Sequence, residues 1–374
     1  MTKLILILSA TLFIYLPGQC QVSVELTDSL TLNGGDVVGA SFGPGGDSVI
    51  VQQVSTIQGH RMRMISRHQT KNRSPVLSQD LGEISAAPSQ ICGRVQFDTR
   101  DDKILVCSAY AYIDVLDAHS LRPLLRMGDG KPQQIFDFVM DEKLNVVATL
   151  SLSLSRSIDL CIYSLSTGKL LGQTRFSGQN LSSMNMADSP RTGKVAINIA
   201  RVSKFGEKSS VSICDINNTL SCTKEFQTDR MNQLEFFGNE LLGASSDTES
   251  KNDCLVRLSS DGKRENSYCA SDSGVHLFFG IVGKRYVVAF TGLTKYDRIR
   301  EESTTTKSTY SVWEAEHKLP SATLDDPYGQ DSDQRFGRIV TSENSAAFLL
   351  YKVHAKQLFV YRIISGEKGD RRVE

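Results

Sequence analysis

The sequence lacks an excess of charge of either sign. Its 42 Lys and Arg residues balance 42 Asp and Glu residues, so the formal net charge is zero. Proteins that bind nucleic acid usually concentrate positive charge, and a funnel for a strongly charged substrate needs one dominant sign. The charge balance therefore indicates no nucleic-acid partner, and it identifies no other partner.

Long apolar runs are equally scarce. A membrane-spanning helix needs about 20 apolar residues in a row, and the only sizeable run, Leu4–Leu16, is shorter than this. Lys3 precedes this run, and Gly18 and Cys20 supply small residues at a cleavage site. A basic start, an apolar middle and a small-residue end predict a secretory signal peptide over residues 1–20.

We therefore expect one exported domain over residues 21–374, located outside the cell, in a periplasm or at a cell surface. We expect it to be monomeric and to have no transmembrane span. The alternative to cleavage is a lipid anchor on Cys20, although such a site normally has a small residue where Gln19 stands. In either case the domain folds where disulfides can form.

Sequence motifs for chemistry are also missing. The chain contains no Walker-type loop, dinucleotide fingerprint, His-Glu-x-x-His run, calcium loop or Cys-x-x-Cys. Gly39–Gly43 matches the Gly-x-Ser-x-Gly pattern of hydrolases, which needs a turn from a strand into a helix. Here Pro44-Gly45-Gly46 leads into another strand instead. We predict no catalytic residue, no metal site and no cofactor.

The cysteines that remain after cleavage are more informative, because six of them form three short-range pairs. Directly opposed residues in a β-hairpin are symmetric about its turn, so a cross-strand disulfide must be symmetric as well. Cys92 and Cys107 centre between Thr99 and Arg100, Cys214 and Cys222 on Asn218, and Cys254 and Cys269 on Asp261-Gly262. We predict three disulfides and an odd buried thiol at Cys161. The alternative is that some of the six are buried and unbridged.

A repeat of roughly 45–55 residues, a period typical of propellers and solenoids, runs through the mature chain. Each copy has a strand ending near Phe or Asp, a polar turn, a strongly apolar strand and two further strands. The apolar strands are Val49–Val51, Ile104–Val106, Val146–Ala148, Val195–Ile197, Leu241–Leu242, Tyr286–Val288 and Ala347–Leu349. No stretch after the signal peptide shows sustained helical periodicity, so the chain is predicted to be nearly all β.

Residues 23–365 thus resemble the WD-repeat and YVTN-type β-propeller superfamily. The resemblance implies an all-β, seven-bladed β-propeller built from four-stranded antiparallel blades. The Trp-Asp dipeptide is represented only by Val312-Trp313-Glu314 and by degenerate versions such as Val115-Leu116-Asp117, so a general propeller is favoured over a strict WD repeat. The last copy supplies three clear strands, and we predict that Val22–Leu26 supplies the fourth and closes the ring.

Five polar residues occupy similar positions a few residues before their blade markers. They are Asp36, Gln90, Gln134, His276 and Arg335. The start of the innermost strand of a propeller blade borders one mouth of the channel, so these residues are candidates for a binding site there. The alternative is that they are solvated loop residues without a ligand.

Two other segments stand out. Thr294–Thr309 interrupts the even spacing of the sixth copy and is either a partner-binding finger or a polar hairpin. His60–Arg73 is locally basic and alternates with Met62 and Met64. That alternation predicts an exposed strand, with an anion site as the alternative.

The resemblance implies an exported, non-catalytic scaffold that binds a protein or another macromolecule through loops on one face. The alternative is a propeller enzyme, such as a hydrolase, a lactonase-like protein or a quinone-dependent dehydrogenase, with its site at the channel mouth. Fold alone does not decide between them.

Overall fold

A computed structural model describes most of the mature chain. The described residues are 22–32, 34–70, 75–84, 92–108, 111–128, 133–189, 192–204, 206–217, 220–245, 254–259, 262–269, 275–283, 285–297, 302–315, 317, 319–328, 337–342, 345–352 and 357–365. For some of the strand residues only the backbone is described. Within these ranges, no helix has the length and apolar character required to cross a membrane. The predicted signal peptide lies outside them.

The described strands form seven four-stranded antiparallel sheets. The strands of each sheet are given from the innermost to the outermost. The first sheet contains β2 (Asp36–Phe42), β3 (Ser48–Ile57), β4 (His60–Gln69) and β5 (Pro75–Glu83), and the second contains β6 (Val95–Phe97), β7 (Lys103–Ser108), β8 (Tyr112–Asp117) and β9 (Pro123–Met127). The third contains β10 (Gln133–Asp141), β11 (Val146–Ser153), β12 (Ser157–Ser164) and β13 (Leu170–Ser177), and the fourth contains β14 (Leu181–Ser189), β15 (Lys194–Ser203), β16 (Gly206–Asp215) and β17 (Ser221–Asp229).

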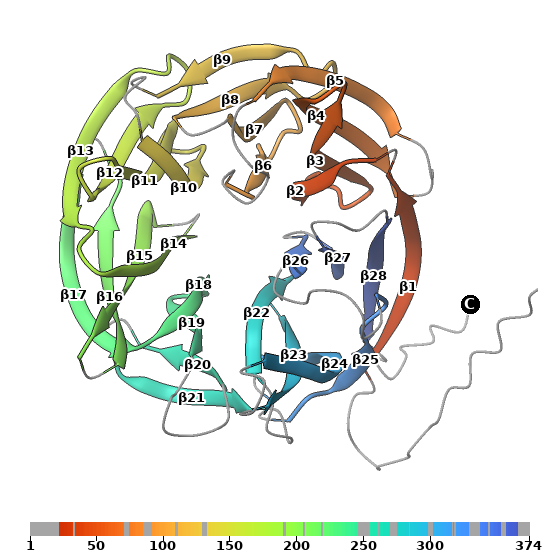
Figure 1. Ribbon diagram of the computed structural model, residues 1–374, viewed down its shortest axis with the longest axis vertical. Helices are drawn as coiled ribbons and strands as arrows, with labels where there is room; N and C mark the ends of the chain where they lie inside the picture. The colour runs from red at the N-terminus through yellow and green to blue at the C-terminus, as the bar shows by residue number, and fades with distance from the viewer. Residues whose placement is uncertain are drawn as a thin grey trace, which may run out of the picture.

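The other three sheets follow the same pattern. They are β18 (Met231–Phe237), β19 (Glu240–Ser245), β20 (Cys254–Leu258) and β21 (Arg264–Cys269); β22 (Val275–Val282), β23 (Tyr286–Asp297), β24 (Glu302–Glu314) and β25 (Ala322–Asp325); and β26 (Gly337–Thr341), β27 (Ala347–Lys352), β28 (Gln357–Ser365) and β1 (Val22–Thr31). Figure 1 shows the sheets as blades around a ring, so the protein is a seven-bladed β-propeller, as the repeat predicted.

The ring is closed by the N-terminal strand. In Figure 1, β1 lies beside β28 as the outermost strand of the seventh blade. The two strands pair antiparallel from Val22 opposite Ser365 to Thr31 opposite Gln357. This confirms the predicted closure, in which the two ends of the domain share one four-stranded blade.

Strand position in the blade explains the hydrophobic pattern. β11 is buried along its first six residues, whereas the outermost strand β13 alternates between exposed and half-buried positions. Side chains of one blade pack against the next, as where Leu160 joins Val195 and Ile197 in one core cluster. Because inner strands are covered on both faces, their sequences are continuous apolar runs, whereas outer strands have one solvent-exposed face.

The Asp residues that end the first strands have a local role. Oδ1 of Asp98 accepts hydrogen bonds from the backbone N–H groups of Asp102 at 2.7 Å and Lys103 at 3.0 Å. Oδ1 of Asp141 accepts one from the N–H of Leu144 at 3.0 Å. Such Asx-type contacts satisfy turn N–H groups, which explains why an acidic residue recurs between the first and second strands.

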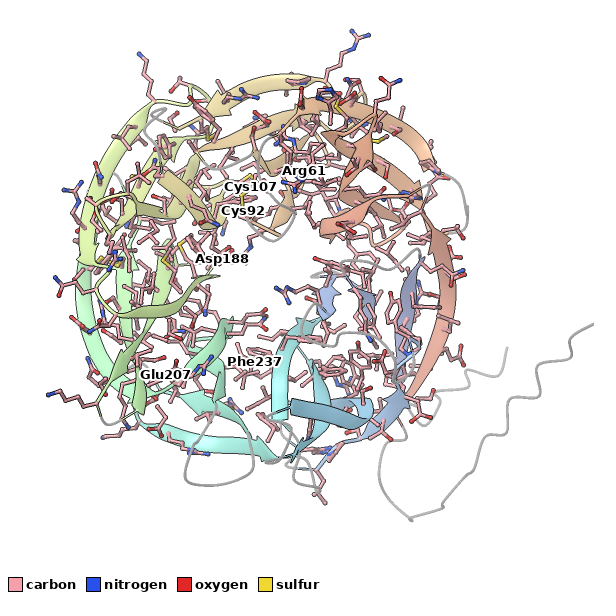
Figure 2. All side chains as sticks on the ribbon, in the orientation of Figure 1. Arg61, Cys92, Cys107, Asp188, Glu207 and Phe237 are labelled. Atoms are coloured by element: carbon pink, nitrogen blue, oxygen red, sulfur yellow. A yellow bond between two sulfur atoms is a disulfide. The ribbon has the colours of Figure 1, made fainter. Side chains whose placement is uncertain are left out.

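Two of the predicted disulfides are present. Cys214 and Cys222 are bonded and lie directly opposite each other in β16 and β17. Cys92 is bonded to Cys107 (Figure 2), but it lies three residues before β6 instead of opposite Cys107 in the ladder. Cys161 is a buried thiol, as predicted. The two bonds are typical of proteins that fold in an oxidising, exported environment.

The third pair is confirmed in its backbone register only. Cys254 lies opposite Cys269 in β20 and β21, and their side chains are outside the described residues. We expect non-reducing peptide mapping of the exported protein to show three bridges, Cys92–Cys107, Cys214–Cys222 and Cys254–Cys269. Only Cys161 should react with an alkylating reagent after denaturation. Alkylation of several of the six without reductant, or a bridge to Cys161, would contradict this assignment.

The prediction of an exposed strand over His60–Arg73 is wrong for the centre of that strand. Arg63 in β4 is 1% exposed. Its guanidinium contacts the Asp114 carboxylate of the next blade at 2.5 Å and donates to the backbone carbonyl of Cys107 at 2.8 Å. The third strand of a blade is covered by the neighbouring blade, so a polar residue there can be buried if that blade supplies a partner.

The interruption at Thr294–Thr309 contains an extended β-hairpin. β23 and β24 pair antiparallel from Tyr286 opposite Glu314 out to Asp297 opposite Glu302. The hairpin alternative is therefore confirmed for the backbone, and whether it acts as a binding finger stays a prediction.

Candidate functional site

The main cavity of interest lies at the mouth of the channel where the innermost strands end. It encloses about 220 Å³. It is lined by residues at the ends of five innermost strands and the turns after them: Ser41, Phe42, Gly43 and Pro44; Gln96, Phe97, Asp98 and Thr99; Met140, Asp141, Glu142 and Lys143; Asp188; and Thr341 and Ser342. Because β2, β6, β10, β14 and β26 all end here, these five strands run in the same direction along the channel.

Contacts between blades fix the rim of this cavity. The Glu142 carboxylate accepts hydrogen bonds from the backbone N–H and the hydroxyl of Thr99, which ties the second blade to the third. Below this contact, the side-chain oxygen of Gln96 accepts a hydrogen bond from the N–H of Met140 at 3.0 Å. The rim is thus held by side chains that each satisfy a group of the next blade.

Arg94 links three blades inside the channel. Its guanidinium lies 3.0 Å from the Asp137 carboxylate and 3.5 Å from that of Asp188, and it donates to the carbonyl of Met186 at 3.2 Å. Asp137 also accepts a hydrogen bond from the N–H of Met186 at 2.9 Å. Figure 2 shows Asp188 at the inner edge of the ring, where it is shared between this cluster and the cavity.

Close backbone packing positions Arg94. The segment before β6 approaches β2, and Arg94 forms an isolated parallel bridge with Ala40. A Cβ atom on Gly39 would lie 2.6 Å from the carbonyl oxygen of Gly93, and one on Gly93 would lie 2.8 Å from that of Val38. Glycine is therefore required at both positions for the two blades to meet at this distance.

A third carboxyl group, that of Glu235 in β18, completes the cluster, because it interacts with the charges of Arg94 and Asp188. One guanidinium thus faces three carboxyl groups. Burial raises the pKa of Glu235 to about 7, against the opposing effects of Arg94 and of the hydrogen bond from Gln233. Burial likewise raises the pKa of Asp188, and Arg94 opposes it. This cluster therefore has more acidic than basic groups, and the Glu235 carboxyl group titrates near neutrality.

This gives a pH-dependent prediction for Glu235→Gln. The folded state keeps the Glu235 proton up to about pH 7, whereas the unfolded state loses it near 4.5. The wild type therefore loses stability relative to the variant as pH rises through this window, by up to about 3 kcal/mol. Chemical denaturation of both proteins at several pH values will measure this difference. A stability difference between wild type and Glu235→Gln that does not change with pH would contradict it.

The site residues predicted from the sequence lie mainly at the opposite mouth. Asp36 begins β2, Gln134 is the second residue of β10, and His276 is the second residue of β22, of which only the backbone is described. Gln90 and Arg335 lie outside the described residues. The three that are described start innermost strands, as predicted, and whether they bind a ligand stays a prediction.

Sequence reasoning missed the channel cluster. Its members, Arg94, Asp137, Asp188 and Glu235, are spread over four blades. A charged residue within an innermost strand, or directly before it in the case of Arg94, was the available signal. No three His, Cys, Asp or Glu side chains in the described part of the chain are arranged to hold a metal ion.

Comparison with known proteins adds no family to this description. No protein-family model matches the chain, and no curated protein matches it.

Proposed function

We propose that the protein is an exported, non-catalytic β-propeller of the WD-repeat or YVTN type that acts as a binding scaffold. The signal-peptide pattern and the two disulfides support export. The repeat of roughly 45–55 residues and the seven blades support the propeller type. The ligand site that we propose is the cavity at the mouth where the innermost strands end.

One observation carries this proposal: five blades contribute polar side chains to a single cavity at one mouth of the channel. Propellers with varied loops on a rigid ring commonly bind through such a convergent surface. The lining includes the carboxyl groups of Asp98, Asp141, Glu142 and Asp188 and one ammonium group, that of Lys143. A cationic group of a partner protein, such as a basic side chain, best complements this excess of carboxyl groups over ammonium groups.

A titration with N-acetyl-arginine amide tests the proposal. Met140 lines the cavity, whereas Met127 is fully buried elsewhere. With 13C-labelled methionine methyl groups, the probe should shift the Met140 signal saturably and leave the Met127 signal unchanged. N-acetyl-glutamate amide, the control ligand, should shift neither.

Asp188→Asn should weaken binding of the arginine probe about tenfold, the effect of losing one hydrogen bond to a charged group. Glu25→Gln, which removes an exposed carboxylate on the outermost strand β1, should leave the affinity unchanged. Equal binding of both probes, or no saturable shift of Met140, would contradict a cationic ligand at this mouth.

The enzyme alternative makes a different prediction. A propeller hydrolase or dehydrogenase would need a bound metal ion or cofactor, or a nucleophile, at a mouth of the channel. Metal analysis of the purified protein distinguishes the two functions, because stoichiometric calcium or another divalent ion would favour the enzyme.

A further inference from the structure

In blades one, three and four, the hairpins between the second and third strands reach the face opposite to the cavity. The first residues of the innermost strands mark that face, and they pair with the ends of the second strands: Asp36 with Val54, Gln133 with Ser153, and Leu181 with Arg201. The chain continues beyond these pairs into the hairpin turns of blades one, three and four. The tips of these hairpins therefore project from the face where the innermost strands start.

Each of these three tips carries an exposed aliphatic side chain. Ile57 is 49% exposed, Leu154 is 80% exposed, and Val202 is 50% exposed. Single apolar residues scattered over a surface are ordinary. Here, however, they recur in the same hairpin of three blades, in the turn or within two residues of it.

Basic residues accompany the three apolar tips. Arg61, Arg156 and Lys204 are all exposed and lie within four residues of the apolar side chain of their own hairpin. The turn sequences 57–61, 153–157 and 202–206 contain no Asp or Glu. Glu83 and Glu207, two of the acidic residues on this face, are paired with His60 and Arg230.

The turns at the opposite face have a different character. Between the first and second strands, the described turns of blades one, two and three carry Asp47, Asp101, Asp102 and Glu142. Arg100 and Lys143 are the basic residues of these turns. The described first-to-second-strand turns of blades one, two and three are thus more acidic than the three apolar tips on the opposite face.

We propose that the face bearing Ile57, Leu154 and Val202 docks onto an anionic phospholipid membrane surface. Apolar side chains at protruding tips can enter the boundary between headgroups and acyl chains, while Arg and Lys beside them contact anionic headgroups. The three tips stand on separate blades, whereas the core of a protein interface is usually one continuous apolar patch. Docking would turn the acidic cavity toward the aqueous side.

Flotation of the mature protein with lipid vesicles tests this proposal. Vesicles of phosphatidylcholine and phosphatidylglycerol in a three-to-one ratio should bind the protein at about 0.1 M salt, and binding should weaken at higher salt as screening grows. Vesicles of phosphatidylcholine alone should bind it much less. The triple variant Ile57→Ser, Leu154→Ser, Val202→Ser should lose about tenfold or more in binding, because less apolar area enters the interface.

A matched control removes equally exposed apolar residues from the other end of the blades. Leu124, Leu170 and Leu171 are 56%, 45% and 46% exposed and start outermost strands near the acidic turns. Their triple replacement by Ser should leave vesicle binding unchanged. Equal loss in both variants, or no binding to anionic vesicles, would overturn the proposal. Binding to immobilised poly-glutamate but not to the vesicles would show that this face receives an acidic protein, and would also overturn it.

Discussion

Replacing Asp114 with Asn should cost about 3–5 kcal/mol of unfolding free energy, the usual effect of leaving a buried charge without its partner. The side chains of Arg63 and Asp114 are 2% and 4% exposed, and their contact joins the first blade to the second. Arg126 also donates to the Asp114 carboxylate at 2.7 Å. The variant keeps the shape of the side chain but leaves the Arg63 guanidinium facing a neutral amide.

The third blade offers a matched control. Asp159 has the same place in its blade as Asp114 and accepts a hydrogen bond from Arg175 at 2.7 Å, as Asp114 does from Arg126. The Arg175 side chain is 65% exposed, so water can solvate it after Asp159→Asn. That variant should cost about 1 kcal/mol or less. Equal losses in the two variants, measured by chemical denaturation, would show that Arg63 is not the source of the effect.

The pH dependence of Asp114 gives a second check. Burial raises the pKa of Asp114, but the hydrogen bond from Arg126 and the charge of Arg63 outweigh it and lower this pKa below the ordinary value of 3.8. A carboxyl group with a lowered pKa stabilises the fold above its unfolded pKa, and this contribution is lost as pH falls through the folded pKa. The difference between wild type and Asp114→Asn should therefore shrink below about pH 4.

Deleting residues 22–30 should destabilise the whole ring, because it removes most of β1 and leaves β28 as an open edge. We expect a large fall in melting temperature. The point variant Leu30→Ala tests the same contact with a chain that still folds. Leu30 is fully buried and packs in one core cluster with Leu358 and Leu349, so its truncation should cost about 2–5 kcal/mol.

Leu26→Ala is the control on the same strand. Leu26 is 55% exposed, so its loss should change stability by less than about 0.5 kcal/mol. An unchanged melting curve for both the deletion and Leu30→Ala would show that β1 does not hold the ring together.

The architecture was predictable because its signals are local and repeated. Strands buried on both faces, such as Val146–Ala148, read as apolar runs, and seven of them give the number of blades. Ring closure followed from an incomplete last copy. The disulfides followed from hairpin symmetry, although Cys92 lies outside its ladder because β6 spans only Val95–Phe97.

The polar interior was not predictable in the same way. Arg63 alternates with methionines as an exposed strand residue would, and its partner Asp114 is 51 positions away in the next blade. The members of the channel cluster, from Arg94 to Glu235, meet only because the ring brings the innermost strands together. Single-sequence patterns carry no information on such pairing between blades.

The claim that the acidic channel mouth is the ligand site is tested most directly by a crystal structure of the mature protein with N-acetyl-arginine amide. We predict that the guanidinium lies in the cavity, within hydrogen-bonding distance of the Asp188 carboxylate. A probe bound elsewhere, with this cavity holding only water, would contradict the proposed site.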